Sequence, residues 1–195
     1  MTLPRFYPIF DSADWLARAF PLGVRLAQLR IKDKDPAPDI ARGLKLARAH
    51  GAILVVNDHW QEAIDAGAEW LHLGQEDLDG ADLSAIRRAG LRLGISTHDH
   101  AELDRALALS PDYVALGPVW PTILKKMKWP QQGLERVSEW KRLAGKTPLC
   151  AIGGVTAERA PDAFGAGADL VAAVTDITLN PDPEARMRQW LAVCG

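Results

Sequence analysis

The chain of 195 residues is 48% hydrophobic and 25% charged, an ordinary composition for a globular protein with one substantial core. Its formal net charge of −2 comes from interspersed acids and bases, so we expect no nucleic-acid partner. No apolar stretch approaches the roughly 18 residues of a membrane span, and we expect no membrane partner. Two cysteines and no recognisable signal peptide favour a cytoplasmic protein, and the sequence is compatible with a homo-oligomer.

Short apolar strands and amphipathic helices alternate without interruption along the chain. We predict strands at residues 5–10, 24–30, 52–56, 69–73, 92–96, 113–116, 148–152 and 168–174. We predict helices at residues 13–20, 36–50, 61–67, 81–89, 99–109, 134–143, 158–165 and 184–193. A long loop, residues 117–133, separates the sixth strand from the helix that follows it.

This regular alternation with short turns predicts a (β/α)8 TIM barrel that forms a single domain over residues 1–195. The alternative, an open doubly wound sheet, favours a glycine-rich first turn. Asp11 and Ser12 stand at that turn instead, so the barrel is the better prediction. In such barrels the chemistry takes place at the carboxyl ends of the strands.

Two carboxylates follow neighbouring strands of the predicted barrel. Asp58 comes just after the third strand, and Asp77 comes soon after the fourth. Adjacent strands lie about 4.8 Å apart, so both side chains can converge on one point. Two carboxylate ligands with room for phosphate oxygens suit Mg²⁺. The alternative is that each aspartate caps the helix after it, but the neighbouring Asn57, Gln75 and Glu76 add more polar groups than capping needs.

The remaining strand ends are rich in cations and amides. They carry Gln28, Arg30, Lys32, Asn57, Gln75, Ser96, Thr122, Lys125, Gly153, Gly154 and Thr175. This set contains no Ser-His-Asp arrangement and no cysteine placed as a nucleophile. Arg30 and Lys32 alternate at one strand end, as a pyrophosphate site would require. The alternative is that they form a solvated strand end beside Asp33 and Lys34.

Several other polar residues have simpler interpretations. Ser96 on its own is best explained as the N-cap of the following helix. His72 lies within a strand and is interpreted as a packed core histidine, whereas His98 and His100 are predicted at the surface. A Gly-Gly pair after the seventh strand, residues 153–154, lets backbone N–H groups approach a ligand at the usual phosphate site of this fold.

Six motifs together resemble the thiamine phosphate synthase family. They are Gln28-Leu29-Arg30-Ile31-Lys32, Val56-Asn57-Asp58, His72-Leu73-Gly74-Gln75-Glu76-Asp77-Leu78, Gly94-Ile95-Ser96-Thr97-His98, Gly117-Pro118-Val119-Trp120-Pro121-Thr122 and Ala151-Ile152-Gly153-Gly154-Val155. They occur in the family's order and spacing over essentially the whole chain. The resemblance implies a barrel enzyme, a transferase that joins 4-amino-2-methyl-5-(diphosphooxymethyl)pyrimidine to a thiazole phosphate and releases pyrophosphate.

The resemblance also implies a role for each site residue. The pyrimidine pyrophosphate would be bound by Gln28, Leu29, Arg30, Ile31, Lys32, Asn57, Ser96 and Lys125, and Mg²⁺ by Asp58 and Asp77. The thiazole phosphate would be bound by Thr122, Ile123, Leu124, Gly154, Val174 and Thr175. Among these, Arg30, Lys32, Ser96 and Lys125 would act in catalysis. In the family, pyrophosphate is thought to leave first, giving a pyrimidine-stabilised cation that the thiazole nitrogen captures.

One position departs from the family pattern. The usual Thr-x-Thr-Lys after the sixth strand is here Thr122-Ile123-Leu124-Lys125, so the second hydroxyl is absent. Two alternative functions therefore remain. A thiazole tautomerase has the same barrel, needs no Mg²⁺ and commonly uses a histidine where this chain has Pro118. A paralogue that only binds a thiamine-pathway phosphate would explain Leu124. Retention of Asp58, Asp77, Arg30 and Lys32 together argues against both alternatives.

Overall fold

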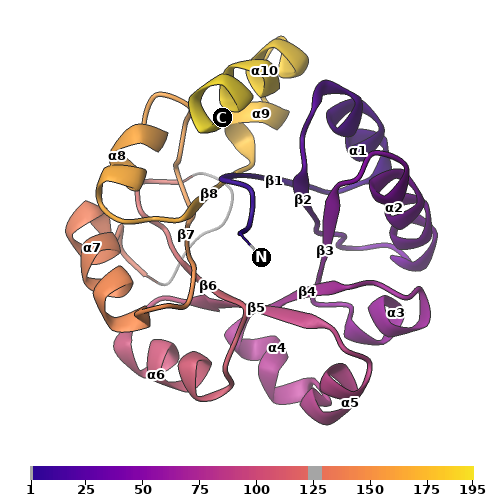
Figure 1. Ribbon diagram of the computed structural model, residues 1–195, viewed down its shortest axis with the longest axis horizontal. Coiled ribbons are helices and arrows are strands. Elements are labelled where there is room, and N and C mark those ends of the chain that lie inside the picture. Colours follow the sequence, from indigo (N-terminus) through magenta and orange to yellow (C-terminus); the bar gives the residue numbers. More distant parts are fainter. Residues whose placement is uncertain (1, 123–128) are drawn as a thin grey trace.

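Eight parallel strands close into a barrel in their order along the chain, with the helices forming a ring around it (Figure 1). This is a computed structural model, and it describes residues 2–122 and 129–195. The predicted site residues Ile123, Leu124 and Lys125 lie outside the described residues. The predicted (β/α)8 fold is confirmed. None of the helices in the described part of the chain has the length and apolarity to span a bilayer.

The strands fall close to their predicted positions. They are β1 (Phe6–Phe10), β2 (Leu26–Leu29), β3 (Ile53–Asn57), β4 (Trp70–Leu73), β5 (Arg92–Thr97), β6 (Tyr113–Leu116), β7 (Leu149–Ala151) and β8 (Leu170–Ala173). The helices are α1 (Ala13–Ala19), η1 (Phe20–Leu22), α2 (Ala37–Ala49), α3 (Trp60–Asp65), α4 (Gln75–Gly80), α5 (Leu83–Arg88), α6 (His100–Ala108), α7 (Gly133–Ala144), α8 (Ala160–Gly165), α9 (Thr175–Thr178) and α10 (Pro183–Cys194). The sequence predicted neither α4 nor α9, whose residues follow the strand ends directly and were assigned to turns.

Each strand divides its side chains between two cores. On β1, Phe6 points outward and stacks on Trp190 of α10 with ring centroids 5.1 Å apart. Tyr7 and Ile9 point the other way, into a separate cluster inside the barrel. The alternation follows from the two-residue period of a strand, and burial on both faces explains why the strands are apolar throughout.

The amino-terminal end of the barrel is filled by apolar side chains. Leu3 packs with Leu26, Trp70 and Leu170 in the inner cluster, and the N-terminus lies over the middle of the ring of strands (Figure 1). Polar residues enter the interior only towards the other end. Among the described residues, the buried polar side chains are Gln28, Asn57, His72 and Thr97. The first three line the cavity inside the barrel, whereas Thr97 faces outward and accepts from Trp140 Nε1. The barrel interior is therefore filled by apolar side chains at the amino ends of the strands and lined by polar ones towards their carboxyl ends.

Candidate active site

A cavity of about 110 Å³ opens inside the barrel near the carboxyl ends of the strands. It is lined by Tyr7, Ile9, Gln28, Arg30, Asn57, His72, Ser96, Ala115, Cys150, Ile152 and Ala172. Four of these residues, Gln28, Arg30, Asn57 and Ser96, are predicted to bind the pyrimidine pyrophosphate. With His72 and Ile152, the structure brings residues from five of the six sequence motifs to one cavity.

A continuous chain of hydrogen bonds crosses the cavity wall from β2 to β5. Gln28 Nε2 donates to the Tyr7 hydroxyl, which lies 2.8 Å from the Tyr113 hydroxyl. The Tyr113 hydroxyl is 2.8 Å from His72 Nδ1, and His72 Nε2 is 2.8 Å from Ser96 Oγ. Ser96 therefore bonds into the barrel interior. The N-cap interpretation of Ser96 is wrong, because Asp99 caps α6 by accepting from the Glu102 N–H.

Burial keeps this hydrogen-bonded chain uncharged. It lowers the pKa of His72 to about 4, with the positive charge of Arg30 adding to the effect and Asp77 opposing it. Burial also raises the pKa of Tyr7 and of Tyr113. A buried charge without a partner is costly, so His72 is a neutral imidazole whose two nitrogens are both engaged. It is buried as predicted, but it also lines the cavity.

A glycine on β5 makes room for Tyr113 in this arrangement. Gly94 is the register partner of Tyr113 across the β5–β6 pair. A Cβ atom at Gly94 would overlap the Tyr113 ring. The glycine of the Gly94-Ile95-Ser96 motif thus lets the tyrosine ring cross the strand, and the tyrosine hydroxyl reaches His72.

The two predicted metal ligands face each other beside this cavity. Burial raises the pKa of the Asp58 carboxyl, and the nearby charge and hydrogen bond of Asp77 raise it further. Lys32 Nζ is 3.9 Å from Asp58 Oδ2, close enough to offset part of this repulsion. No third His, Cys, Asp or Glu joins the two carboxylates to form a metal-binding group within residues 2–122 and 129–195.

Local backbone geometry sets the direction of both carboxylates. Asp58 has φ of +63°, a left-handed conformation that is uncommon for a non-glycine residue and that occurs at functional sites. Asp77 lies in the first turn of α4, and a Cβ atom at Gly74 would come within 2.8 Å of its Oδ2. His59 and Gly74 occupy the N-cap positions of α3 and α4, so neither aspartate is the cap of its helix.

His59, which the sequence analysis did not single out, contacts the segment after β2 next to Asp58. His59 Nε2 is 3.0 Å from the Ile31 carbonyl oxygen, and the Arg30 N–H donates to the Phe10 carbonyl at 2.7 Å. Leu29 and Ile31 are buried in the outer core, so a bound substrate would meet their backbone. The predicted alternative of a solvated strand end fails for Arg30, which lines the cavity.

The loops after β6 and β7 pack tightly against each other. Gly153 and Gly154 have φ of +92° and +64°, and a Cβ atom at either would collide with the chain after β6. At Gly154 the collision is with Trp120 Cβ at 2.7 Å and with the Pro121 carbonyl. The Trp120 N–H also donates to the Gly153 carbonyl at 2.9 Å. Glycine is required here both by conformation and by space.

A second predicted phosphate-binding segment follows β8. Val174 packs against the inner cluster, and Thr175 begins α9. The Val174 carbonyl accepts from the N–H groups of Ile177 and Thr178. Gly154, Val174 and Thr175 therefore lie on the loops after β7 and β8, and Thr122 lies on the loop after β6, where phosphate sites of this fold are usually found.

A sequence model described as thiamine monophosphate synthase matches residues 6–177 of this chain. The chain belongs to the thiamine monophosphate synthase family. A thiamine-phosphate synthase of Rhizobium etli is 62% identical, over 98% of this chain and 96% of the relative. One from an Enterobacter species is 48% identical, over 97% of this chain and 91% of the relative. The family resemblance predicted from the six motifs is confirmed.

A solved structure from the same family has the same fold. The thiamine phosphate pyrophosphorylase of Pyrococcus furiosus superposes with a TM-score of 0.86, covering 97% of this chain and 95% of its own. Sequence identity between the two is 24%, so this likeness supports the barrel rather than particular site residues.

Two residues of the candidate site, Tyr7 and Tyr113, are not predicted from the sequence. Each carries a hydroxyl inside an apolar strand, where a buried polar group needs a partner, and this signal could have identified them. His98 is half-buried rather than a surface residue. Its Nδ1 is 2.7 Å from Glu102 Oε2, and its ring stacks on Trp129 with centroids 5.9 Å apart. His100 is exposed, as predicted.

Proposed function

We propose that this chain joins 4-amino-2-methyl-5-(diphosphooxymethyl)pyrimidine to a thiazole phosphate, giving thiamine phosphate and pyrophosphate in a Mg²⁺-dependent reaction. One observation carries the proposal. A single cavity is lined by Gln28, Arg30, Asn57 and Ser96, and the Asp58–Asp77 pair stands beside it. Family membership supports the same reaction.

The cavity wall suits an uncharged heterocycle. Its hydrogen-bonded side chains are neutral, and they offer both donors and acceptors to ring nitrogens and an amino group. Cys150 also lines the cavity, but burial raises the pKa of its thiol well above the usual range. A protonated thiol is a poor nucleophile, which agrees with a reaction that needs no covalent enzyme intermediate.

Charge at the mouth of the cavity suits the departing pyrophosphate. Arg30, Lys32 and Lys125 would hold its oxygens and stabilise the negative charge that develops as the carbon–oxygen bond breaks. Asp58 and Asp77 fit Mg²⁺, because they supply two carboxylates close to each other. Phosphate oxygens and water would complete the coordination of the ion. The bound ion would supply further positive charge to the pyrophosphate.

The thiazole phosphate would enter from the opposite side of the barrel opening. Its phosphate would be held by Thr122, Gly154, Val174 and Thr175 on the loops after β6, β7 and β8. The thiazole nitrogen would then capture the pyrimidine-stabilised cation. Both substrates would bind before the bond breaks, so the cation is shielded from water.

The test is incubation of the protein with both substrates and Mg²⁺, followed by detection of thiamine phosphate and pyrophosphate. We expect both products in equal amounts, with none after the divalent ion is chelated. A thiazole tautomerase would instead convert a thiazole isomer without the pyrimidine substrate. Formation of neither product by the wild-type chain would overturn the proposal.

Leu124 provides a second test against a paralogue that only binds phosphate. If the chain is a working transferase, Leu124→Thr should change the KM for the thiazole phosphate only modestly, because a neutral hydrogen bond contributes about 1 kcal/mol net. A paralogue that has lost activity predicts another pattern, in which the wild type forms no product and activity appears in the variant. Product formation by both proteins at matched substrate concentrations decides between them.

We also propose a cytosolic location. Cys150 and Cys194 are both free thiols. Unpaired cysteines fit a reducing compartment, where disulfide bonds are rare.

A further inference from the structure

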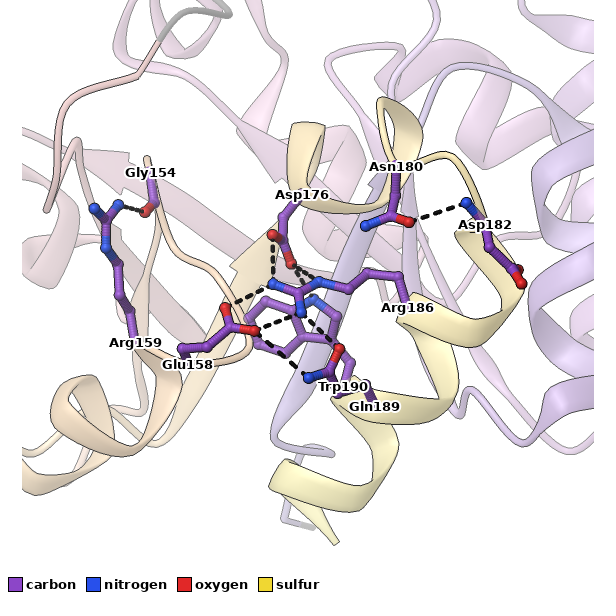
Figure 2. Close-up of polar contacts among 9 residues, drawn as sticks. All are labelled: Gly154, Glu158, Arg159, Asp176, Asn180, Asp182, Arg186, Gln189 and Trp190. Atoms are coloured by element: carbon purple, nitrogen blue, oxygen red, sulfur yellow. Dashed lines mark hydrogen bonds and ion pairs between the residues drawn. The ribbon is translucent and has the colours of Figure 1, made fainter.

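An arginine on α10 joins two carboxylates that follow different strands of the barrel (Figure 2). Arg186 donates from Nε and Nη2 to Asp176, at 2.8 and 2.7 Å. The same guanidinium donates from Nη1 and Nη2 to Glu158, at 2.6 and 2.7 Å. Two forked ion pairs thus share one planar cation, a geometry that fixes both carboxylates in direction as well as distance.

The shared cation is largely removed from solvent. The side chains of Arg186 and Asp176 are 11% and 12% exposed. Trp190 Nε1 also donates to Asp176 Oδ2 at 2.7 Å, so that carboxylate has three donors from α10. Glu158 is more exposed, at 61%, yet its hydrogen bonds to Arg186 lower its pKa to about 2. Glu158 is therefore ionised at neutral pH, and it pairs with the charged Arg186.

The two carboxylates belong to the two loops that carry the predicted phosphate-binding residues. Asp176 directly follows Thr175 at the start of α9, and Glu158 follows Gly154 in the segment between β7 and α8. Beside Glu158, Arg159 Nη1 donates to the Gly154 carbonyl at 2.6 Å, and its guanidinium carbon lies 5.5 Å from the centre of the Trp120 ring. The loop after β7 is thus held by both arginines.

We propose that Arg186 is a positioning residue for the phosphate of the thiazole substrate, a role that rests on the function proposed above. Its donors are occupied by Asp176 and Glu158, so it acts through the geometry of the loops rather than by contact with the phosphate. Backbone groups on two separate loops can hold one phosphate only if the distance between the loops is fixed. Arg186 supplies that fixed distance from outside the barrel.

If Arg186 only stabilised the fold, its loss would affect both substrates equally. Arg18 provides a matched control for this alternative. Arg18 on α1 forms an ion pair with Glu184 on the same helix α10, at 2.6 Å, and touches neither phosphate loop. Arg18→Gln removes an arginine–carboxylate ion pair from α10 and leaves the contacts of both phosphate loops in place. Arg186→Lys keeps the charge but loses the forked geometry, because an ammonium cannot hold two carboxylates in one plane.

The experiment measures the KM for each substrate and the calorimetric Kd for the thiazole phosphate in wild type, Arg186→Gln, Arg186→Lys and Arg18→Gln. We expect Arg186→Gln to raise the thiazole KM and Kd about tenfold, as expected for losing charge-assisted hydrogen bonds. The KM for the pyrimidine pyrophosphate should change less than about twofold. Arg186→Lys should show a smaller thiazole effect, and Arg18→Gln should match the wild type for both substrates.

Equal changes for the two substrates, or equal effects of Arg186→Gln and Arg18→Gln, would overturn the positioning role. If Arg186→Gln does not fold, Glu158→Gln tests the same idea at an exposed residue, with an expected rise of about threefold in the thiazole Kd alone; an unchanged Kd would overturn it. A wild type that forms no thiamine phosphate would refute the proposed function instead. The calorimetric Kd would still report on Arg186 in that case.

Discussion

At the scale of single residues, the proposed Mg²⁺ site rests on the environment of Asp58 beside Asp77. Burial and the neighbouring Asp77 raise the pKa of Asp58, and Lys32 at 3.9 Å offsets this only in part. A bound cation relieves the repulsion between a half-buried carboxylate such as Asp58 and a second carboxylate beside it. This environment is the reason why we propose that the pair binds Mg²⁺.

Replacing either carboxylate should therefore affect turnover far more than folding. We expect Asp58→Asn or Asp77→Asn to lower kcat on the order of 10²-fold, because losing one charged ligand at the transition state costs about 3 kcal/mol. Pyrophosphate release is measured as Mg²⁺ is titrated. Asp79→Asn is the control, since Asp79 lies on the same helix α4 but pairs with Arg105 at the surface. Near-normal activity of either site variant at limiting Mg²⁺ would refute the assignment.

Replacing Arg30 or Lys32, the cations after β2, should affect the binding of one substrate more than the other. Arg30 lines the cavity and Lys32 lies beside Asp58, so Arg30→Gln or Lys32→Gln should raise the KM for the pyrimidine pyrophosphate about tenfold or more. The KM for the thiazole phosphate should change little. Lys34→Gln is the matched control in the same loop, because Lys34 pairs with Asp39 at 2.6 Å. Equal increases in KM for both substrates would mean that Arg30 and Lys32 support the fold instead.

At the scale of elements, the loop after β7 can be tested with a pair of glycines. Gly154 and Gly51 have similar positive φ values, +64° and +59°. Alanine at a positive φ costs about 1 kcal/mol in backbone strain. Only at Gly154 would the new Cβ also collide with the loop after β6, whereas nothing lies within 4 Å of it at Gly51.

Gly154→Ala should therefore lower Tm further than Gly51→Ala does, and it alone should raise the KM for the thiazole phosphate. Thermal unfolding and steady-state kinetics of the two variants give both quantities. The difference between them isolates the packing of the loops after β6 and β7 from the backbone strain that they share. If the variants behave alike, the tight loop packing does not shape the phosphate site.

The sequence predicted every strand of this barrel but missed two helices that begin at the strand ends. β6 was predicted with its observed bounds, and every other strand overlaps its prediction, because buried parallel strands are apolar runs between polar turns. α4 and α9 were missed. Their few residues begin directly at the strand ends, and Asp77 and Thr175 lie in them. The errors therefore concentrate at the site, where local polarity serves binding rather than periodicity.

At the scale of the whole molecule, the barrel places side chains together that no local pattern connects. Tyr7, Gln28, His72, Ser96 and Tyr113 come from β1, β2, β4, β5 and β6, yet they form one hydrogen-bonded chain. Their meeting depends on strand register and on which way each side chain points. Motifs could identify Gln28 and Ser96, but the partners of these residues emerge only from the closed barrel.

This shared network predicts how stability depends on pH. Burial lowers the pKa of His72 to about 4, below its unfolded value of 6.5, so the unfolded chain binds the proton first as pH falls. The stability that neutral His72 contributes is fully present above pH 6.5 and is lost progressively down to about pH 4. The slope is about 1.4 kcal/mol per pH unit, so about 2 kcal/mol disappears between pH 6.5 and 5.

Urea unfolding of the wild type and of His72→Gln at pH 6.5 and at pH 5 measures this contribution. The variant should be less stable at pH 6.5, because it breaks hydrogen bonds to Tyr113 and Ser96. It should also lose about 2 kcal/mol less than the wild type on acidification, since it has no imidazole to protonate. Groups that titrate in both proteins, such as Asp58, cancel in the comparison. Equal losses would mean that His72 is protonated in the folded barrel, and that the neutral cavity wall inferred for the pyrimidine does not exist at pH 5.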